Sequence, residues 1–393
     1  MSLLGPLRIL DLGGDWGGLP GLVLAQMGAE VILVEPPGGD PARHKAPTNG
    51  GASLPWAAWN LSKKSVTLDL DHERDRESFI KLVATADAVI ESHRPGFLAG
   101  QGLAPSTMMA ENPGLVVTSL TAFGQDGPRA GNAASDTTVM ALSGLMEVTG
   151  FPGAPPLRLG YDQIGSLGAL QAALGTLIAH FAKGTDGQGQ HVDVSVLDAA
   201  RLANYREPLR WEFQQAIETR RGNVARRGQG GFTSTIWKCA DGWVTWSASD
   251  DPRRARSFFE TAAENGIALD WQDHDFACEK PADMPQERID AMEADIAPFF
   301  LRYSRAELED MAREKGWILI ALLDLEEAAA QPQLAARGYW AEAEIGGQML
   351  PVPGFPFLTS DAQPAHKGPP PVPGQHNDDI LGALQSSTAA EAS

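Results

Sequence analysis

Five short apolar segments, rich in β-branched residues, alternate with helical segments in the first third of the chain. This alternation constrains the fold more than any other feature of the sequence. The segments cover residues 7–14, 30–37, 64–70, 87–92 and 114–124. Residues 72–86, between the third and the fourth, have the apolar spacing of a helix. Because parallel strands that are buried on both faces read as nearly continuous apolar runs, the pattern predicts an α/β fold with a Rossmann-like parallel sheet.

The composition changes near residue 220. Residues 220–232 are basic and rich in glycine, with no apolar period, and residues 233–249 then read as a β-hairpin around Ala-Asp-Gly. Helical segments follow to about residue 330. Since 393 residues are too many for one simple core, we expect a second, smaller α+β lobe to begin near residue 220.

The net charge of −19 argues against nucleic acid or an anionic membrane as a general partner. An anionic ligand must therefore find a local basic pocket. The two cysteines, Cys239 and Cys278, have no CxxC spacing, which excludes a disulfide scaffold and a Cys-rich zinc site. With no recognisable signal peptide and no uninterrupted run of about 18 apolar residues, we expect a cytoplasmic protein without a membrane span or a metal site.

Asp162 is the only acidic or basic residue between Leu159 and Ala179, at the start of an otherwise apolar helix. Asp is among the best N-cap residues, and capping alone explains its place. A carboxylate at a helix N-terminus stays ionised, and it is also a potential nucleophile toward an activated carbonyl. Gly165 and Gly168 on the first turns would leave room for a bulky ligand.

The glycine-rich turn at residues 13–21 suggests a nicotinamide dinucleotide site, with Glu35 at the distance of a ribose-binding acid. The pattern G-x-G-x-x-G fits in no register, however, so a plain tight turn explains these glycines better. Clustered glycines at residues 226–232, including Gly230 and Gly231, indicate a flexible linker, a lid or an oxyanion site made of backbone amides.

Basic residues occur in three places near the predicted sheet. Arg43 lies in a turn after a buried strand, and Lys63 and Lys64 precede another strand; spacing alone indicates an exposed loop and a solvated pair. His93 and Arg94 directly follow a strand. Since ligands of open α/β sheets bind outside the carboxyl ends of the strands, this third place is favoured as a site.

Taken in order, these segments resemble the family III CoA-transferases, relatives of α-methylacyl-CoA racemase. The resemblance covers nearly the whole chain and includes GPLRILDL (5–12), EPPGGDPAR (35–43), SHRPG (92–96), GYDQIGSLG (160–168) and GQHNDDIL (374–381). It implies two lobes: residues 1–219 and 331–393 form a large CoA-binding lobe, and residues 220–330 form a small one. It also implies a homodimer of interlocked subunits.

The resemblance further implies an enzyme that moves CoA from an acyl-CoA donor to a carboxylic acid through a covalent intermediate on Asp162. Acyl-CoA is then a substrate, and no ATP, metal or permanent cofactor is required. Gly230 and Gly231 are the candidate oxyanion donors. The candidate CoA contacts are Trp16, Arg43, Lys64, Ser92, His93 and Arg94.

The chain departs from its relatives at several candidate positions. Trp16 stands where members similar to formyl-CoA transferase carry Gln, and Ser92 and His93 replace the Asn and Phe of E-N-F-R-P-G. These departures indicate a substrate unlike formate or oxalate. The alternatives are an α-methylacyl-CoA racemase, whose relatives carry His where this chain has Ser135, and one subunit of a two-subunit CoA-transferase, whose partner commonly lacks the aspartate.

Overall fold

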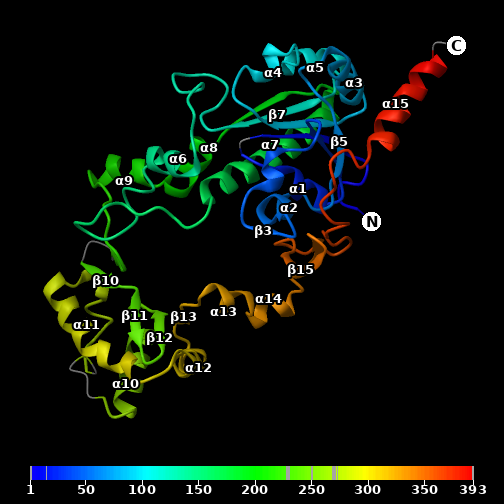
Figure 1. Cartoon of the computed structure of the whole chain (residues 1–393). Helices are drawn as coiled ribbons and strands as arrows, with labels where there is room; N and C mark the ends of the chain where they lie inside the picture. Colours follow the sequence, from blue (N-terminus) through cyan, green and yellow to red (C-terminus); the bar gives the residue numbers. More distant parts are fainter. Residues whose placement is uncertain are drawn as a thin grey trace. The chain divides into compact units, whose positions relative to one another are not determined.

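The computed structural model describes residues 2–14, 16–226, 231–248, 251–267, 271 and 273–391. The chain divides into two compact units, shown in Figure 1. Unit 1 consists of Met1–Met146, Arg158–Ile217 and Pro332–Ser393. Unit 2 consists of Glu147–Leu157 and Glu218–Gln331.

Residues 147–157 belong to unit 2, whereas the sequence analysis assigned them to the large lobe. Their backbone and side chains contact the start of the second segment of that unit. Gly222 N–H donates to the Gly150 carbonyl at 2.8 Å, and the Arg220 guanidinium lies 2.8 Å from the Glu147 carboxylate. These contacts link positions about 70 residues apart in the chain, which no local pattern reveals.

Unit 1 is built on a six-stranded sheet with the order β5-β2-β1-β6-β7-β8. Every neighbouring pair in it is parallel, which confirms the predicted α/β fold. Its strands are β1 (Arg8–Gly14), β2 (Glu30–Glu35), β5 (Lys64–Thr67), β6 (Ala88–Ser92), β7 (Val116–Thr121) and β8 (His191–Ser195).

Helices cover both faces of this sheet, so alternate residues of each strand enter different cores. One core joins the side chains of Leu10, Val89 and Val117 to three helices: α3 (Glu73–Ala84), α4 (Phe97–Gly100) and α5 (Pro105–Glu111). The other core joins Ile9 and Ile90 to α1 (Leu19–Gln26) and α7 (Gln163–Asp186). Each such side chain contributes about 1.5–3 kcal/mol through burial.

The remaining elements of unit 1 lie around this sheet. The chain end contributes the antiparallel hairpin of β14 and β15 and the helix α15 (Figure 1). Their bounds are α2 (Leu54–Trp59), β3 (Thr48–Asn49), β4 (Ala52–Ser53), α6 (Asp136–Ser143), α8 (Val196–Arg201), α9 (Glu207–Gln214), α14 (Pro332–Ala336), β14 (Trp340–Ile345), β15 (Gln348–Pro353) and α15 (Asn377–Glu391).

By length and composition alone, one helix in the described part of the chain, α7, could cross a membrane. Its polar side chains are few, and 44% of its most apolar 18-residue window is buried inside the protein. Core helices pass the same test, so this is weak evidence for a membrane span. The sequence showed no uninterrupted apolar run here because Gln171, Thr176 and His180 divide the helix.

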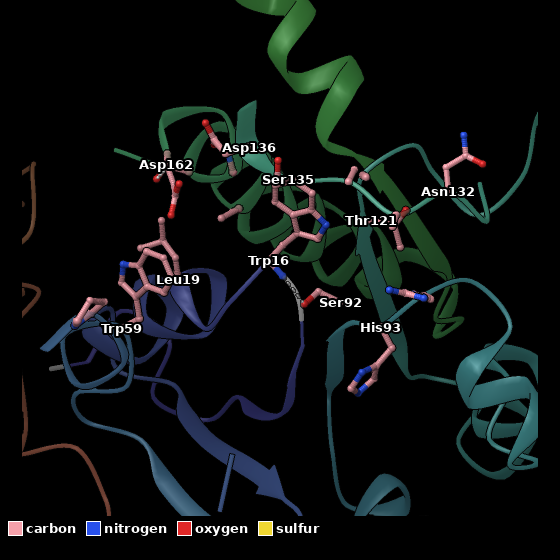
Figure 2. A pocket seen from close by; sticks show the side chains of 18 of the residues that line it. Trp16, Leu19, Trp59, Ser92, His93, Thr121, Asn132, Ser135, Asp136 and Asp162 are labelled. Atoms are coloured by element: carbon pink, nitrogen blue, oxygen red, sulfur yellow. Dashed lines mark hydrogen bonds between the residues drawn. The ribbon is translucent and has the colours of Figure 1, made fainter. Parts of the chain in front are cut away.

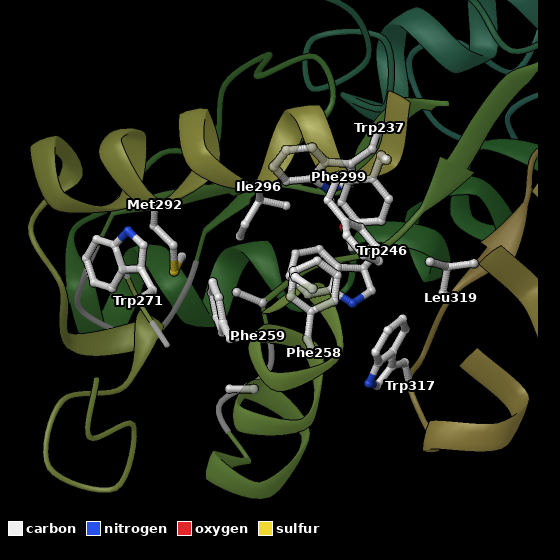
Figure 3. Close-up of a cluster of buried hydrophobic side chains, with 14 of the residues drawn as sticks. Trp237, Trp246, Phe258, Phe259, Trp271, Met292, Ile296, Phe299, Trp317 and Leu319 are labelled. Atoms are coloured by element: carbon white, nitrogen blue, oxygen red, sulfur yellow. The ribbon is translucent and has the colours of Figure 1, made fainter. Parts of the chain in front are cut away.

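Unit 2 has an aromatic core between a small antiparallel sheet and three helices (Figure 3). The ring centroids of Trp246 and Phe258 lie 4.4 Å apart, and those of Phe258 and Phe299 lie 5.0 Å apart. The sheet contains the hairpin predicted for residues 233–249. The elements of this unit are β9 (Val224–Arg226), β10 (Phe232–Ser234), β11 (Ile236–Cys239), β12 (Gly242–Thr245), β13 (Ile320–Ala321), α10 (Pro252–Glu264), α11 (Gln286–Leu301), α12 (Arg305–Lys315) and α13 (Leu325–Ala329).

Candidate active site

A cavity of about 510 Å³ opens in unit 1 at the carboxyl ends of the strands. Trp16 follows β1, Ser92 ends β6 and is followed by His93, and Thr121 ends β7; all of them line the cavity. The start of α7 with Asp162 forms another part of its wall, as Figure 2 shows. The cavity therefore lies where ligands of parallel sheets bind.

Asp162 is the N-cap residue of α7, but its side chain forms no capping hydrogen bond. The carboxylate is exposed and lines the cavity. Asp162 thus occupies the N-cap position, but its side chain does not cap the helix. The carboxylate remains available to a ligand.

Asp136 supplies the acceptor that Asp162 does not. One oxygen of its carboxylate lies 2.7 Å from the backbone nitrogen of Gly165, and the Ile164 N–H also donates to this carboxylate. Burial raises the pKa of Asp136, and the charge of Asp162 raises it further. Asp136 was not among the site residues predicted from the sequence, although Ser135 forms a capping box with Thr138 and so indicates a helix start at this position.

The glycine-rich turn after β1 brings Trp16 against the first turn of α7. Trp16 N–H donates to Ser92 Oγ at 3.1 Å, and Ser92 Oγ donates to the Gly13 carbonyl at 2.9 Å. A Cβ atom on Gly14, whose φ is +109°, would lie 2.6 Å from Ser92 Oγ. A Cβ atom on Gly165 would lie 3.2 Å from the Trp16 ring. Glycine is therefore required here by close backbone approach, which agrees with the tight turn favoured over a dinucleotide site.

Lys63 lies buried beneath this turn, although its spacing indicated a solvated side chain. Its ammonium group lies 2.7 Å from the Asp11 carboxylate, 2.7 Å from the Gly18 carbonyl and 2.8 Å from Asn60 Oδ1. Burial lowers the pKa of Lys63, and the nearby Asp11 opposes this effect. The other Asp11 oxygen accepts the Gly13 N–H, so the buried ion pair supports the turn that carries Trp16.

Of the predicted basic contacts, His93 and Arg94 line the cavity. Lys45, which the sequence analysis did not single out, also lines it. No local signal distinguishes Lys45, because it reaches the cavity only through the path of the loop after β2. Lys45 and Arg94 provide the local positive charge that an anionic ligand of this acidic chain requires, and His93 adds a polar ring beside them.

Arg43 and Lys64 do not line this cavity. The Arg43 guanidinium forms a bidentate ion pair with Glu35, at 2.5 and 2.6 Å, and its side chain is only 11% exposed. It also lies over the Trp56 ring, 3.8 Å from the centroid. Lys64 begins β5 and lies 2.6 Å from the Glu30 carboxylate at the start of β2, so it occupies the amino edge of the sheet.

Gly230 lies outside the described residues. Gly231 is part of unit 2, where its N–H donates to the Met284 carbonyl at 3.3 Å. A Cβ atom on Gly231 would lie 2.6 Å from the Gln286 side-chain oxygen, which explains the glycine by packing alone. Among the residues that the structure describes, no three His, Cys, Asp or Glu side chains gather as metal ligands.

Comparison with known proteins identifies the class of this site. Residues 4–377 match the CoA-transferase family III. The chain is 32% identical to the succinyl-CoA:(R)-benzylsuccinate CoA-transferase subunit BbsE of Thauera aromatica, over 95% of this chain and 92% of that protein. It is 33% identical to a succinyl-CoA–D-citramalate CoA-transferase of Chloroflexus aurantiacus, over 85% and 82%.

A solved structure of a CAIB/BAIF family protein from Brucella suis is similar over 98% of this chain and 99% of that one. The TM-score is 0.83 at 26% sequence identity. The carboxylate-lined cavity of unit 1 is thus set in the fold of enzymes that act on CoA thioesters. The chain belongs to CoA-transferase family III, as its resemblance indicated.

Proposed function

We propose that this enzyme transfers CoA from an acyl-CoA donor to a carboxylic acid through a covalent intermediate on Asp162. The observation that supports this most is the uncapped carboxylate of Asp162 in the cavity wall. A carboxylate that is held by the N–H groups of its own helix would be a weaker nucleophile. Because Asp136 accepts the Gly165 N–H, the Asp162 oxygens are left to react.

In the first half of this reaction, an Asp162 oxygen attacks the thioester carbonyl, and the carbon–sulfur bond breaks. The products are a mixed anhydride and CoA thiolate. The thiolate then attacks the aspartyl carbonyl and displaces the donor acid as its carboxylate. CoA is now held on Asp162 as a thioester.

The second half reverses these steps with the acceptor. The acceptor carboxylate attacks the Asp162 thioester and releases CoA thiolate. The thiolate attacks the acceptor's carbonyl in the new anhydride, which forms acyl-CoA and regenerates the Asp162 carboxylate. Bonds of similar energy are exchanged at each step, so the cycle consumes no ATP.

We assign the phosphates of CoA to the positive charge of Lys45 and Arg94 and to the ring of His93, which line the same cavity as Asp162. Figure 2 shows Asp162 near Leu19 and Trp59, and His93 beyond Trp16. The apolar side chains near Asp162 would then face the acyl group.

Gly230 and Gly231 remain our proposed donors to the tetrahedral oxyanions. Unit 1 is proposed as the CoA-binding lobe and unit 2 as the small lobe, which keeps the lobes expected from the sequence except that residues 147–157 belong to the small one. Since two relatives are named for succinyl-CoA, this thioester is the first donor to test. We also propose that the enzyme acts in the cytoplasm.

A homodimer is supported by an apolar stripe on the exposed side of α7. Its side chains recur at helical spacing and are between 36% and 85% exposed: Leu167, Leu170, Leu174, Ile178 and Phe181. A second copy that covers this stripe, as in the interlocked dimer proposed here, would remove the apolar surface from water. A different second subunit is the alternative, because one relative is itself named as a subunit.

A racemase is the second candidate function, and one observation favours it. Asp136 approaches the same helix end as Asp162, and its raised pKa suits a group that carries a proton. Two such groups on opposite sides of an α-carbon would exchange its proton. The transferase is preferred because Asp136 already accepts backbone N–H groups.

Trapping the covalent intermediate tests the proposal. The enzyme is incubated with succinyl-CoA and quenched with hydroxylamine, and peptide mass spectrometry then locates the hydroxamate. We expect the label at Asp162 and none in Asp162→Asn, which keeps a good N-cap residue. Turnover in deuterated water without a label, but with deuterium at the α-carbon, would replace the transferase by the racemase.

A further inference from the structure

Glu91 is a buried acid at the end of β6, with 4% of its surface exposed. No Lys or Arg in the described part of the chain contributes to its pKa, which burial raises. Glu35, at the end of β2, is equally buried but is paired with Arg43. A buried carboxylate without a cation is costly, so its retention requires an explanation from the groups around it.

Three hydrogen bonds involve Glu91 or its partner Ser119, and two of them cross between neighbouring strands. The hydroxyl of Ser119, directly opposite in the β6–β7 register, forms a hydrogen bond with the carboxylate. Ser119 Oγ also lies 2.9 Å from Nε2 of His191 on β8. The third bond runs from the His93 N–H to Glu91 Oε2, at 2.8 Å.

The last of these bonds reaches the cavity. His93 and Arg94 are part of the turn at residues 92–95, which lines the cavity. The Glu91 carboxylate holds the backbone of this turn at His93, the first residue after β6. Ser92 lies between Glu91 and His93 in the chain, and its hydroxyl hydrogen bonds to the Gly13 carbonyl and the Trp16 N–H. A shift of the turn would therefore move the Trp16 backbone as well.

We propose that Glu91 is a positioning residue for CoA transfer. Its carboxylate, supported through Ser119 by His191, fixes the turn at 92–95 so that His93 and Arg94 meet the phosphates of CoA. The inference rests on the proposed CoA site. It assigns to this acid a role through the backbone, with no contact to the substrate.

The proposal is tested with Glu91→Ala, Glu91→Gln and Ser119→Ala. The control is Thr118→Val on β7, which removes a buried hydroxyl hydrogen bond of 2.7 Å to Thr176 on α7. Hydrogen exchange of the peptide that contains His93 reports the turn directly, and KM for succinyl-CoA and kcat report its consequence.

In Glu91→Ala we expect faster exchange at His93 and a KM raised about tenfold, as for the loss of roughly 1.4 kcal/mol of binding, with a smaller change in kcat. Glu91→Gln keeps an acceptor oxygen and should restore both values. Ser119→Ala should act in the same direction and to a smaller extent, which keeps the test valid if Glu91→Ala does not fold. Thr118→Val should leave exchange at His93 and KM at their parental values.

Parental exchange at His93 in a folded Glu91→Ala or Ser119→Ala variant overturns the proposal, and so does a parental KM. Arg94→Ala separates this failure from that of the CoA site. If Arg94→Ala raises KM and Glu91→Ala does not, the positioning role alone is wrong. If Arg94→Ala has the parental KM, the CoA role of the turn is wrong as well.

Discussion

The carboxylate of Asp136 lies 2.7 Å from the backbone nitrogen of Gly165, in the first turn of α7. Through this contact a residue of α6 takes the acceptor position that the N-cap residue Asp162 leaves open. The helix end is satisfied from outside, and the reactive carboxylate is separated from its usual structural task. Two acids at one helix N-terminus are tolerated because the helix dipole and the free N–H groups favour negative charge there.

Asp136→Ala should destabilise the protein by about 1 kcal/mol, the usual cost of losing a helix-capping acceptor. It should also lower kcat, because the freed N–H groups can then draw in the Asp162 carboxylate. Asp136→Asn retains an acceptor oxygen and should keep most of the stability. Urea unfolding and single-turnover kinetics measure the two effects; a fully active Asp136→Ala enzyme would show that Asp162 needs no such support.

Asp136→Asn should also change the pH dependence of stability. The pKa of Asp136 is raised in the folded protein, so the fold binds a proton more tightly than the unfolded chain does. As pH rises through this raised pKa, ionisation costs the parent stability that the neutral Asn does not lose. The free energy of unfolding of the variant, relative to the parent, should rise over this range and then stay level. A flat difference would contradict the raised pKa.

Lys45→Ala should weaken CoA binding by about 1.5–3 kcal/mol, the value of one charged hydrogen bond to phosphate. Lys64→Ala is the matched control. It removes an equal charge, but at the amino edge of the sheet beside Glu30. Calorimetry should show weaker CoA binding for Lys45→Ala and parental binding for Lys64→Ala. Weaker binding in Lys64→Ala alone would place the phosphates of CoA at the amino edge of the sheet instead.

Arg43→Met should destabilise the protein by about 3–5 kcal/mol, because it leaves the Glu35 carboxylate buried without its partner. The double variant Arg43→Met, Glu35→Gln removes both charges and should recover part of that loss. Urea denaturation followed by circular dichroism measures both. Equal stability of the parent and Arg43→Met would mean that the ion pair does not stabilise the fold. Contact with CoA would then again be the explanation for Arg43.

Leu174→Glu with Ile178→Glu should dissociate the proposed homodimer, because two charges would enter the apolar stripe of α7. Met349→Glu is the control at an apolar side chain of β15 that is 59% exposed. Sedimentation velocity of each variant gives its oligomeric state. A parent that sediments as a monomer, or an α7 variant that remains dimeric, would contradict this interface.

The parallel sheet could be predicted from the sequence because its signal is local. Strands buried on both faces are rich in apolar and β-branched residues, and residues 30–35 (EVILVE) and 116–121 (VVTSLT) show this without reference to any partner. Asp162 could be singled out for the same reason, since one carboxylate in an apolar helix stands out in the chain. The place of His93 and Arg94 followed from the direction of a single strand.

The contacts of the basic residues could not be assigned in this way, because the sequence does not show which acid or ligand a basic side chain meets in the fold. Arg43 and Lys45 are two positions apart, yet one is bound to Glu35 and the other lines the cavity. Adjacent residues Lys63 and Lys64 likewise separate, one to the buried Asp11 and one to Glu30 at the surface.

The same holds for Asp136, whose hydrogen bond to Gly165 spans 29 positions. Such pairings depend on which side chains the folded backbone brings within about 3 Å, and on how much water it removes from them. Local pattern was therefore sufficient for the strands and for the isolated acid. The partners of every charge around that acid were set by contacts that exist only after the chain has folded.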